Sequence, residues 1–334
     1  MPRKTASIEN DELRVTVTVE GGHIAEILEK STGVNPLWTP PWPSIEPSEY
    51  SFDKHPEYGD NSESKLLAGI RGHNLALDIF GAPSPEEFRA GVTVHGEASV
   101  VRYQVDALPD RIIMNAHLPL AMLDFTRDLW LEPGGIVRIT ETVGNLLAMD
   151  RPIAWTQHVT LGPPFIEQGV TELHLPAKRS LVYPTDLSEY QSYQPGAEFE
   201  WPNVPNKDGS HSDLGIFTNR ERSAGVTAHL IDANDEGWFT AYHPQLKLAF
   251  GYTWNRKDFP WISLWEENRS RENPPWNGNT ITRGVEFGVS PFAEGRRAMI
   301  ERGSLFGTPT YRWLAANSSA TVEYAVLARR IESY

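Results

Sequence analysis

Cysteine is absent from the 334 residues of this chain. Its absence excludes disulfide bonds and thiolate metal sites. Common catalytic motifs are missing as well: there is no phosphate-binding loop, no Gly-x-Ser-x-Gly elbow, no His-Glu-x-x-His and no dinucleotide fingerprint. The ten histidines show no tight ligand spacing, and no acidic loop resembles a calcium site. We therefore expect neither a catalytic metal nor a cofactor.

Basic residues are scarce relative to acidic ones. The chain has 30 Lys and Arg against 44 Asp and Glu, so its net charge is −14 and its pI is near 5.2. Binding to nucleic acid needs concentrated basic side chains that replace the counterions of the phosphates. Nucleic acid is therefore excluded as a partner, and polyanionic substrates are disfavoured.

Long apolar runs are also missing. No run approaches the roughly 18 residues that span a bilayer, and residues 1–10 have no signal-peptide core. We expect no membrane partner and a cytoplasmic location.

Alternating apolar and polar residues, with Gly, Pro, Asp and Asn between the alternating segments, are abundant. This pattern is typical of half-buried strands joined by turns. Without alternation of strands and helices, it predicts an all-β fold, a large antiparallel sandwich with few short helices, formed by residues 1–334 as a single domain. The predicted strands include residues 13–19, 98–105, 111–118, 125–131, 136–143, 225–230, 246–254 and 320–328.

Two long stretches rich in proline and aromatic residues interrupt this pattern, at residues 37–58 and 183–213. Both are too long for plain connections. We expect ordered loops that cover a face of a sheet.

Three titratable residues lie in positions suited to proton transfer. His158 lies on a strand-like run that ends in a Gly-Pro-Pro turn, His95 precedes a glycine, and Glu286 stands between Val285 and Phe287. Opening a sugar hemiacetal needs a base for the anomeric hydroxyl and an acid for the ring oxygen. A histidine suits the acid, and a carboxylate among apolar neighbours suits the base. A plain core or rim role for each of the three stays open.

Further polar and aromatic residues are candidates for binding sugar hydroxyls and stacking on sugar rings. Arg71, His73 and Asn74 stand together, but a solvated turn explains them equally well. Asp213 ends the second long loop, where a turn or cap role competes with binding. The remaining candidates are the tryptophans Trp155 and Trp265, for which core packing or loop anchoring is the alternative.

These residues, in this order, resemble the galactose mutarotase-like family, the aldose 1-epimerases and their divergent relatives. The resemblance spans most of the chain and is carried by residues 20–27, His95-Gly96-Glu97-Ala98, Trp155-Thr156-Gln157-His158 and Gly284-Val285-Glu286-Phe287-Gly288. It implies a large antiparallel β-supersandwich fold and an aldose 1-epimerase-like isomerase.

By this resemblance, Glu286 matches the general base and His158 the general acid. His95 matches the histidine on the ring-oxygen side, while Arg71 and Asp213 are looser matches to substrate-binding residues. The chain departs from true galactose mutarotases in having Val159-Thr160-Leu161-Gly162 after His158, and Phe287 where those enzymes place a proline. The resemblance therefore implies a divergent branch, whose members either act on other sugars or only bind them.

Alternatives remain open on the sequence. The partner is a small-molecule sugar or a sugar phosphate, for which Arg71, Lys65 or Arg89 are possible phosphate ligands. A non-catalytic carbohydrate-binding protein is the main alternative to the enzyme, and an accessory module of a polysaccharide lyase or glycosidase is a third. The two leading hypotheses differ in whether His158 and Glu286 lie in one pocket, with room for a pyranose between them. The oligomeric state is not predicted.

Overall fold

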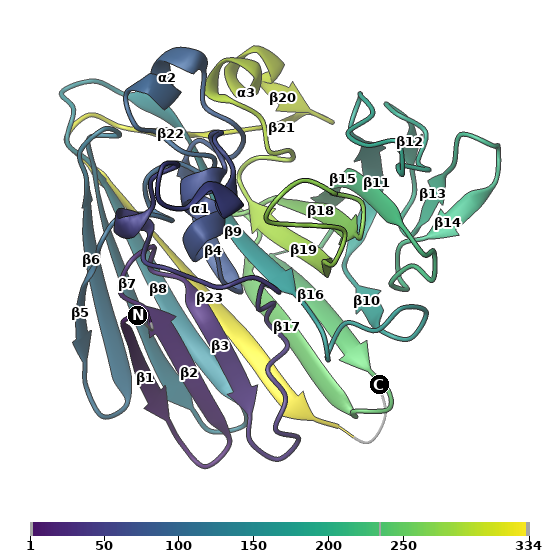
Figure 1. Cartoon of the computed structure of the whole chain (residues 1–334), viewed down its shortest axis with the longest axis horizontal. Helices are drawn as coiled ribbons and strands as arrows, with labels where there is room; N and C mark the ends of the chain where they lie inside the picture. The colour runs from purple at the N-terminus through teal and green to yellow at the C-terminus, as the bar shows by residue number, and fades with distance from the viewer. Residues whose placement is uncertain (1–2, 234, 332–334) are drawn as a thin grey trace.

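Two large antiparallel β-sheets form the body of the protein, which we describe from a computed structural model covering residues 3–233 and 235–331 (Figure 1). The first is an 11-stranded sheet. Its strands follow the order β1 (Thr5–Glu9), β2 (Leu13–Thr18), β3 (Ile24–Glu29), β4 (His73–Asp78), β9 (Arg151–Leu161), β19 (Ile281–Gly288), β18 (Trp261–Asn268), β15 (Ser223–Ile231), β11 (Ala177–Val182) and β12 (Glu198–Phe199), with β22 (Arg312–Leu314) paired to β9.

The second sheet has eight strands. Their order is β10 (Glu172–His174), β16 (Glu236–His243), β17 (Leu248–Asn255), β23 (Ser319–Arg330), β8 (Ile136–Asn145), β7 (Leu123–Glu132), β6 (Arg111–Leu118) and β5 (Gln104–Ala107). Two small ribbons complete the strands, β13 (Asn203–Pro205) with β14 (His211–Asp213) and β20 (Ser304–Leu305) with β21 (Thr308–Pro309).

Helices are few and short, as predicted. They are α1 (Ser64–Gly69), α2 (Pro85–Arg89) and α3 (Arg296–Arg302), with 3₁₀ turns η1 (Pro47–Glu49) and η2 (Pro56–Tyr58). In Figure 1, α1 lies in front of β4 and β9, and α2 and α3 stand together at one end of the molecule. None of the helices in the described part of the chain has the length and apolar character that a membrane span requires.

The all-β antiparallel sandwich predicted from the sequence is confirmed. Most predicted strands match observed ones within two or three residues, but the strand predicted over 98–105 is wrong. Only Gln104–Ala107 is extended there. The backbone N–H groups of Val100 and Val101 both donate to the Glu97 carbonyl, at 2.9 and 3.0 Å. Residues 98–101 therefore form a buried turn, and their alternation reflects packing within that turn.

Alternation along β9 and β19 decides which side chains enter the core between the sheets. Trp155 and Gln157 both donate hydrogen bonds to Glu141 of β8, at 3.0 and 2.6 Å. Phe287 stacks on Trp254 of β17, with ring centroids 4.1 Å apart. Because neighbouring residues of a strand point to opposite faces, residues 158 and 286 point away from this core. The outer face of the first sheet therefore carries the candidate catalytic residues.

A buried ion pair lies in the core beneath β9. Arg127 Nε donates to Glu141 Oε1 at 2.8 Å, and both side chains are fully buried. Glu141 also accepts hydrogen bonds from Trp155, Gln157 and Tyr324. The pair thus links strands of the second sheet to the inner face of β9.

Both long proline-rich stretches lie against the first sheet. The Trp38 N–H donates to the Thr160 carbonyl of β9 at 2.8 Å, which holds the stretch 37–58 at the end of that strand. The stretch 183–213 contains β12, β13 and β14, and its residues 187–189 line a cavity on the outer face of the sheet.

Breaking the buried ion pair is expected to destabilise the fold strongly. Arg127→Met leaves the Glu141 carboxylate buried without its cation, and the expected loss in the free energy of unfolding is about 3–5 kcal/mol. The control is Arg89→Met, which removes an ion pair with Glu86 whose side chains are 70% and 74% exposed and is expected to cost at most about 1 kcal/mol. Urea unfolding measures both. Equal losses in the two variants would contradict a structural role for the buried pair.

Candidate active site

His158 and Glu286 are in direct contact on the outer face of the first sheet. They are register partners on the neighbouring antiparallel strands β9 and β19. Directly opposed side chains on such strands start about 4.5–5.5 Å apart. The His158 Nε2 atom accordingly lies 2.9 Å from Glu286 Oε1, and both side chains are almost completely buried.

This contact corrects one expectation from the sequence. No pyranose fits between His158 and Glu286, because the two side chains touch. Strand pairing is the reason, since it fixes them side by side on one surface. The anomeric oxygen and the ring oxygen of a sugar are both bonded to the same carbon, however, so an acid and a base that serve them must stand side by side.

The second nitrogen of His158 is also held. Its Nδ1 atom lies 3.0 Å from the Thr160 hydroxyl on the same face of β9. A hydroxyl can donate to Nδ1 or accept from it, so this contact orients the ring in either protonation state. The imidazole is thus held between the Thr160 hydroxyl and the Glu286 carboxylate.

His95 packs against this pair. Its ring centroid lies 4.6 Å from that of His158, and its Nδ1 donates to Asn74 Oδ1 at 3.1 Å. The backbone of His95 is left-handed, with φ at 67°, which is uncommon for a residue other than glycine and recurs at functional sites. Burial, together with the nearby His158 and His23, holds the pKa of His95 well below its ordinary value. His95 is therefore neutral, and its Nε2 is an acceptor.

Two glycines make this arrangement possible. A Cβ on Gly284 would lie 2.6 Å from Glu286 Oε1 and 3.3 Å from the Trp265 ring. At Gly96, φ is +77° and a Cβ would meet the Leu77 carbonyl oxygen at 2.2 Å. Gly284 thus leaves room for the carboxylate, and Gly96 lets the loop that carries His95 approach β4.

A cavity of about 650 Å³ opens over these side chains. Its volume lies within the usual range of small-molecule sites. His95, His158 and Glu286 all line it. One wall is apolar and comes mainly from α1 and two tryptophans: Leu66, Leu67, Ile70, Val94, Trp265 and Trp276.

The lining of the cavity is strongly acidic. Among the described residues, Arg271 is the one cation that lines it, whereas six carboxylates do: Glu63, Glu189, Glu266, Glu267, Glu272 and Glu286. Arg271 Nη1 donates to Glu63 at 3.0 Å, and Arg271 Nε lies 3.6 Å from Glu267. Its guanidinium also lies over the Trp276 ring, 4.7 Å from the centroid. The lining cation is therefore already engaged by carboxylates and an aromatic face.

The predicted substrate-binding residues divide into those near the cavity and those away from it. Trp265 lines the cavity, with its ring centroid 5.9 Å from that of His158. Asn74 is fully buried and holds His95 from behind. It is therefore a positioning residue in this structure.

His73 and Trp155 lie on the wrong face of the sheet for substrate contact. His73 is fully buried in the core, where its two nitrogens contact the Tyr252 hydroxyl and Gln157 Oε1 at 3.1 and 2.9 Å. Burial lowers the pKa of His73 to about 3. Trp155 points to the same core and donates to Glu141. Strand alternation is the reason for both corrections, and the solvated turn considered for residues 71–74 is wrong from His73 onward.

Arg71 and Asp213 do not line the cavity. Asp213 Oδ1 accepts the Gly215 N–H at 2.7 Å, which is the turn role that the sequence allowed. The sequence did not single out Arg271, Trp276 or helix α1 as parts of a site. Trp276 and Arg271 belong to the irregular segment after β18, where periodicity gives no signal. The sequence did single out the run Trp265-Glu266-Glu267, which forms the beginning of this wall.

Within residues 3–233 and 235–331, no three His, Asp or Glu side chains form a cluster that could hold an ion.

Comparisons with known proteins support the fold. No protein-family model and no curated protein matches the chain. Among solved structures, a candidate aldose 1-epimerase from Klebsiella pneumoniae is 14% identical with a TM-score of 0.65, over 97% of this chain and 78% of that one. A galactose mutarotase-like protein from Clostridium acetobutylicum is 12% identical with a TM-score of 0.64, over 98% and 96%. A galactose mutarotase related enzyme from Lactobacillus acidophilus is 12% identical with a TM-score of 0.62, over 99% of each chain.

These similarities cover nearly the whole of this chain at low sequence identity. They show that the chain has the galactose mutarotase-like fold, and the resemblance seen in the sequence is confirmed at that level.

Stability is expected to fall in mild acid because several histidines are buried in neutral form. Burial lowers the pKa of His23, His73, His95 and His229 from an ordinary value of 6.5. Below about pH 6.5 the unfolded chain binds protons that the folded protein does not, so the free energy of unfolding decreases as the pH falls. Each histidine contributes about 1.4 kcal/mol per pH unit at most. Urea unfolding between about pH 7 and 5 measures the slope, and a stability independent of pH in this window would contradict the assignment.

Proposed function

We propose that the protein is an aldose 1-epimerase-like isomerase, which interconverts the anomers of a sugar by opening and reclosing its ring. The observation that carries the proposal is the direct contact between His158 and Glu286 on the floor of the cavity. A histidine and a carboxylate side by side provide an acid and a base for two oxygens of one carbon. No metal or cofactor is needed for this reaction.

The ring opens by two proton transfers. Glu286 accepts the proton of the anomeric hydroxyl, the bond between C1 and the ring oxygen breaks as the C1 carbonyl forms, and His158, in its doubly protonated imidazolium form, gives its Nε2 proton to the ring oxygen and is left as the neutral ring. Rotation about the C1–C2 bond then presents the other face of the carbonyl. On reclosure, His158 takes the proton back from the attacking hydroxyl and Glu286 returns a proton to the carbonyl oxygen. The enzyme ends in its starting protonation state.

Neighbouring side chains support these two transfers. The Thr160 hydroxyl fixes the His158 ring, and the neutral His95 offers Nε2 as an acceptor for a sugar hydroxyl. The Trp265 ring forms part of the wall beside His158 and is a stacking surface for the C–H face of the sugar. Arg71, His73, Asp213 and Trp155 have no role in this proposal.

We propose an uncharged sugar as the partner. A phosphate group would enter a cavity lined by six carboxylates whose one lining cation already contacts Glu63 and Glu267. Lys65, Arg71 and Arg89, the cations considered for a phosphate, do not line the cavity. The single domain over residues 1–334, the cytoplasmic location and the independence from a metal stay predictions.

Removing the base is expected to stop turnover and keep binding. Glu286→Gln preserves the size of the side chain and removes its ability to accept a full proton. The expected loss in anomer exchange is about 10²–10⁴-fold, with sugar affinity changed little. His158→Asn is expected to lose a similar factor. Exchange NMR on a panel of aldoses measures the rates, and titration by NMR measures the affinities.

The matched control is Asp213→Asn, because Asp213 is a carboxylate that does not line the cavity and accepts a hydrogen bond within a turn. Its exchange rate is expected to equal that of the wild type. Full activity of Glu286→Gln would overturn the catalytic assignment. Sugar binding by the wild type without exchange of any aldose would favour a non-catalytic carbohydrate-binding protein.

Phosphorylated sugars are expected to bind poorly. Repulsion by the acidic lining should weaken the affinity for an aldose 6-phosphate about tenfold or more relative to the same free aldose. The difference should shrink as salt is raised, since the lining reaches solvent and is screened. Competition experiments at low and high ionic strength provide the comparison. Tighter binding of the phosphate would contradict the proposed substrate class.

A further inference from the structure

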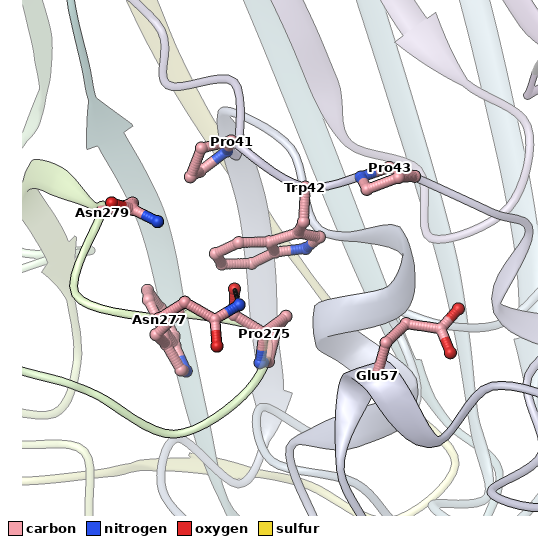
Figure 2. A pocket seen from close by; sticks show the side chains of 8 residues that line it. Pro41, Trp42, Pro43, Glu57, Pro275, Asn277 and Asn279 are labelled. Carbon is pink, nitrogen blue, oxygen red and sulfur yellow. Dashed lines mark hydrogen bonds between the residues drawn. The ribbon is translucent and has the colours of Figure 1, made fainter.

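A second, smaller cavity of about 260 Å³ lies next to the one described above (Figure 2). Figure 2 shows the Trp42 ring at its centre, with Asn277 and Asn279 on one side and Glu57 on the other. Pro41, Pro43 and Pro275 complete its rim, and Trp276 also lines it. We call this cavity the Trp42 pocket.

The Trp42 ring is held rigidly although it is partly exposed. Its Nε1 donates to the Leu67 carbonyl at 2.9 Å. Its ring packs edge-on against Trp38 and Trp276, with centroids 5.5 and 5.0 Å apart. A fixed aromatic surface can bind the C–H face of a sugar without losing side-chain freedom on binding.

The polar groups around the ring suit an uncharged, hydroxyl-rich ligand. Asn277 and Asn279 are exposed, and Asn277 Nδ2 donates to the Pro275 carbonyl at 3.1 Å, which orients its amide. The Asn279 N–H donates to the Trp276 carbonyl at 3.0 Å, which fixes the turn that carries both amides. Glu57 is the lining carboxylate, and none of the described residues that line the pocket is a cation. Amide and carboxylate groups pair with sugar hydroxyls, and an anionic ligand finds no counter-charge here.

Trp276 connects this pocket to the candidate active site. It lines both cavities, and it stacks on Trp38 with an interplanar angle of 8°. Trp276 therefore lies between the two cavities.

We propose that the Trp42 pocket is an outer subsite that binds the next unit of a reducing oligosaccharide. This inference rests on the proposed function, which places the reducing end of the substrate on Glu286 and His158 at the floor of the larger cavity. The Trp265 ring lies beside His158 and contacts the Trp276 ring, with centroids 6.0 Å apart, so a sugar stacked on Trp265 extends towards Trp276. A chain extended from this sugar passes the Trp276 edge and stacks its next unit on Trp42. The substrate class is thus a neutral reducing oligosaccharide.

The test compares monosaccharides with oligosaccharides. Trp42→Ala and Asn279→Ala are assayed by anomer exchange on a panel of reducing trisaccharides and on their constituent monosaccharides. Each variant is expected to raise KM for the preferred trisaccharide about fivefold to tenfold, the size of one aromatic stacking contact, and to leave the monosaccharide KM and kcat unchanged. The matched control is Trp313→Ala, since Trp313 is 61% exposed and lies on β22. It is expected to change neither substrate.

Several outcomes separate this inference from the proposed function. Unchanged trisaccharide KM in both variants would overturn the subsite and leave the epimerase proposal intact. Equal losses for monosaccharide and trisaccharide would also overturn it, because Trp42 would then act only through the inner cavity. If the wild type exchanges no sugar, saturation-transfer NMR with the trisaccharides decides. If Asn279→Ala weakens the binding of the trisaccharides, the subsite is supported although the protein is not an epimerase. If neither variant weakens that binding, the subsite is overturned.

Discussion

The antiparallel pairing of β9 with β19 is the constraint on which the rest of the site depends. It places His158 opposite Glu286 and brings Nε2 within 2.9 Å of the carboxylate. A shift of one residue in this register would turn one of the two side chains into the core. The chemistry of the site is therefore a direct consequence of sheet register, and it requires neither a long loop nor a second subunit to bring the two groups together.

The inner face of the same strand explains why this register is stable. Trp155 and Gln157 anchor β9 to Glu141, which is itself paired with Arg127. On β19, Phe287 stacks on Trp254 across the sandwich. The polar contacts are specific in direction, since Trp155, Gln157 and Arg127 Nε each donate to a carboxylate oxygen of Glu141. The core thus fixes the strands, and the opposite faces of the same strands carry the candidate acid and base.

The sequence predicted the strands well because alternation reports directly on half-buried sheets. It also identified His95, His158 and Glu286, which the structure brings together, although their roles stay proposals. It failed for His73 and Trp155, since proximity to a motif does not reveal which face of a strand a residue occupies. It missed Arg271 and Trp276, because the irregular segment after β18 has no period, and its position over the cavity depends on contacts with α1 and with the stretch 37–58.

In the proposed complex, the C1 end of a sugar rests on the pair formed by His158 and Glu286. A crystal structure of the Glu286→Gln variant with a bound aldose would show this arrangement. We expect the anomeric oxygen within hydrogen-bond reach of residue 286 and the ring oxygen within reach of His158 Nε2. A sugar bound with its anomeric carbon at the mouth of the cavity, or bound away from both residues, would contradict it.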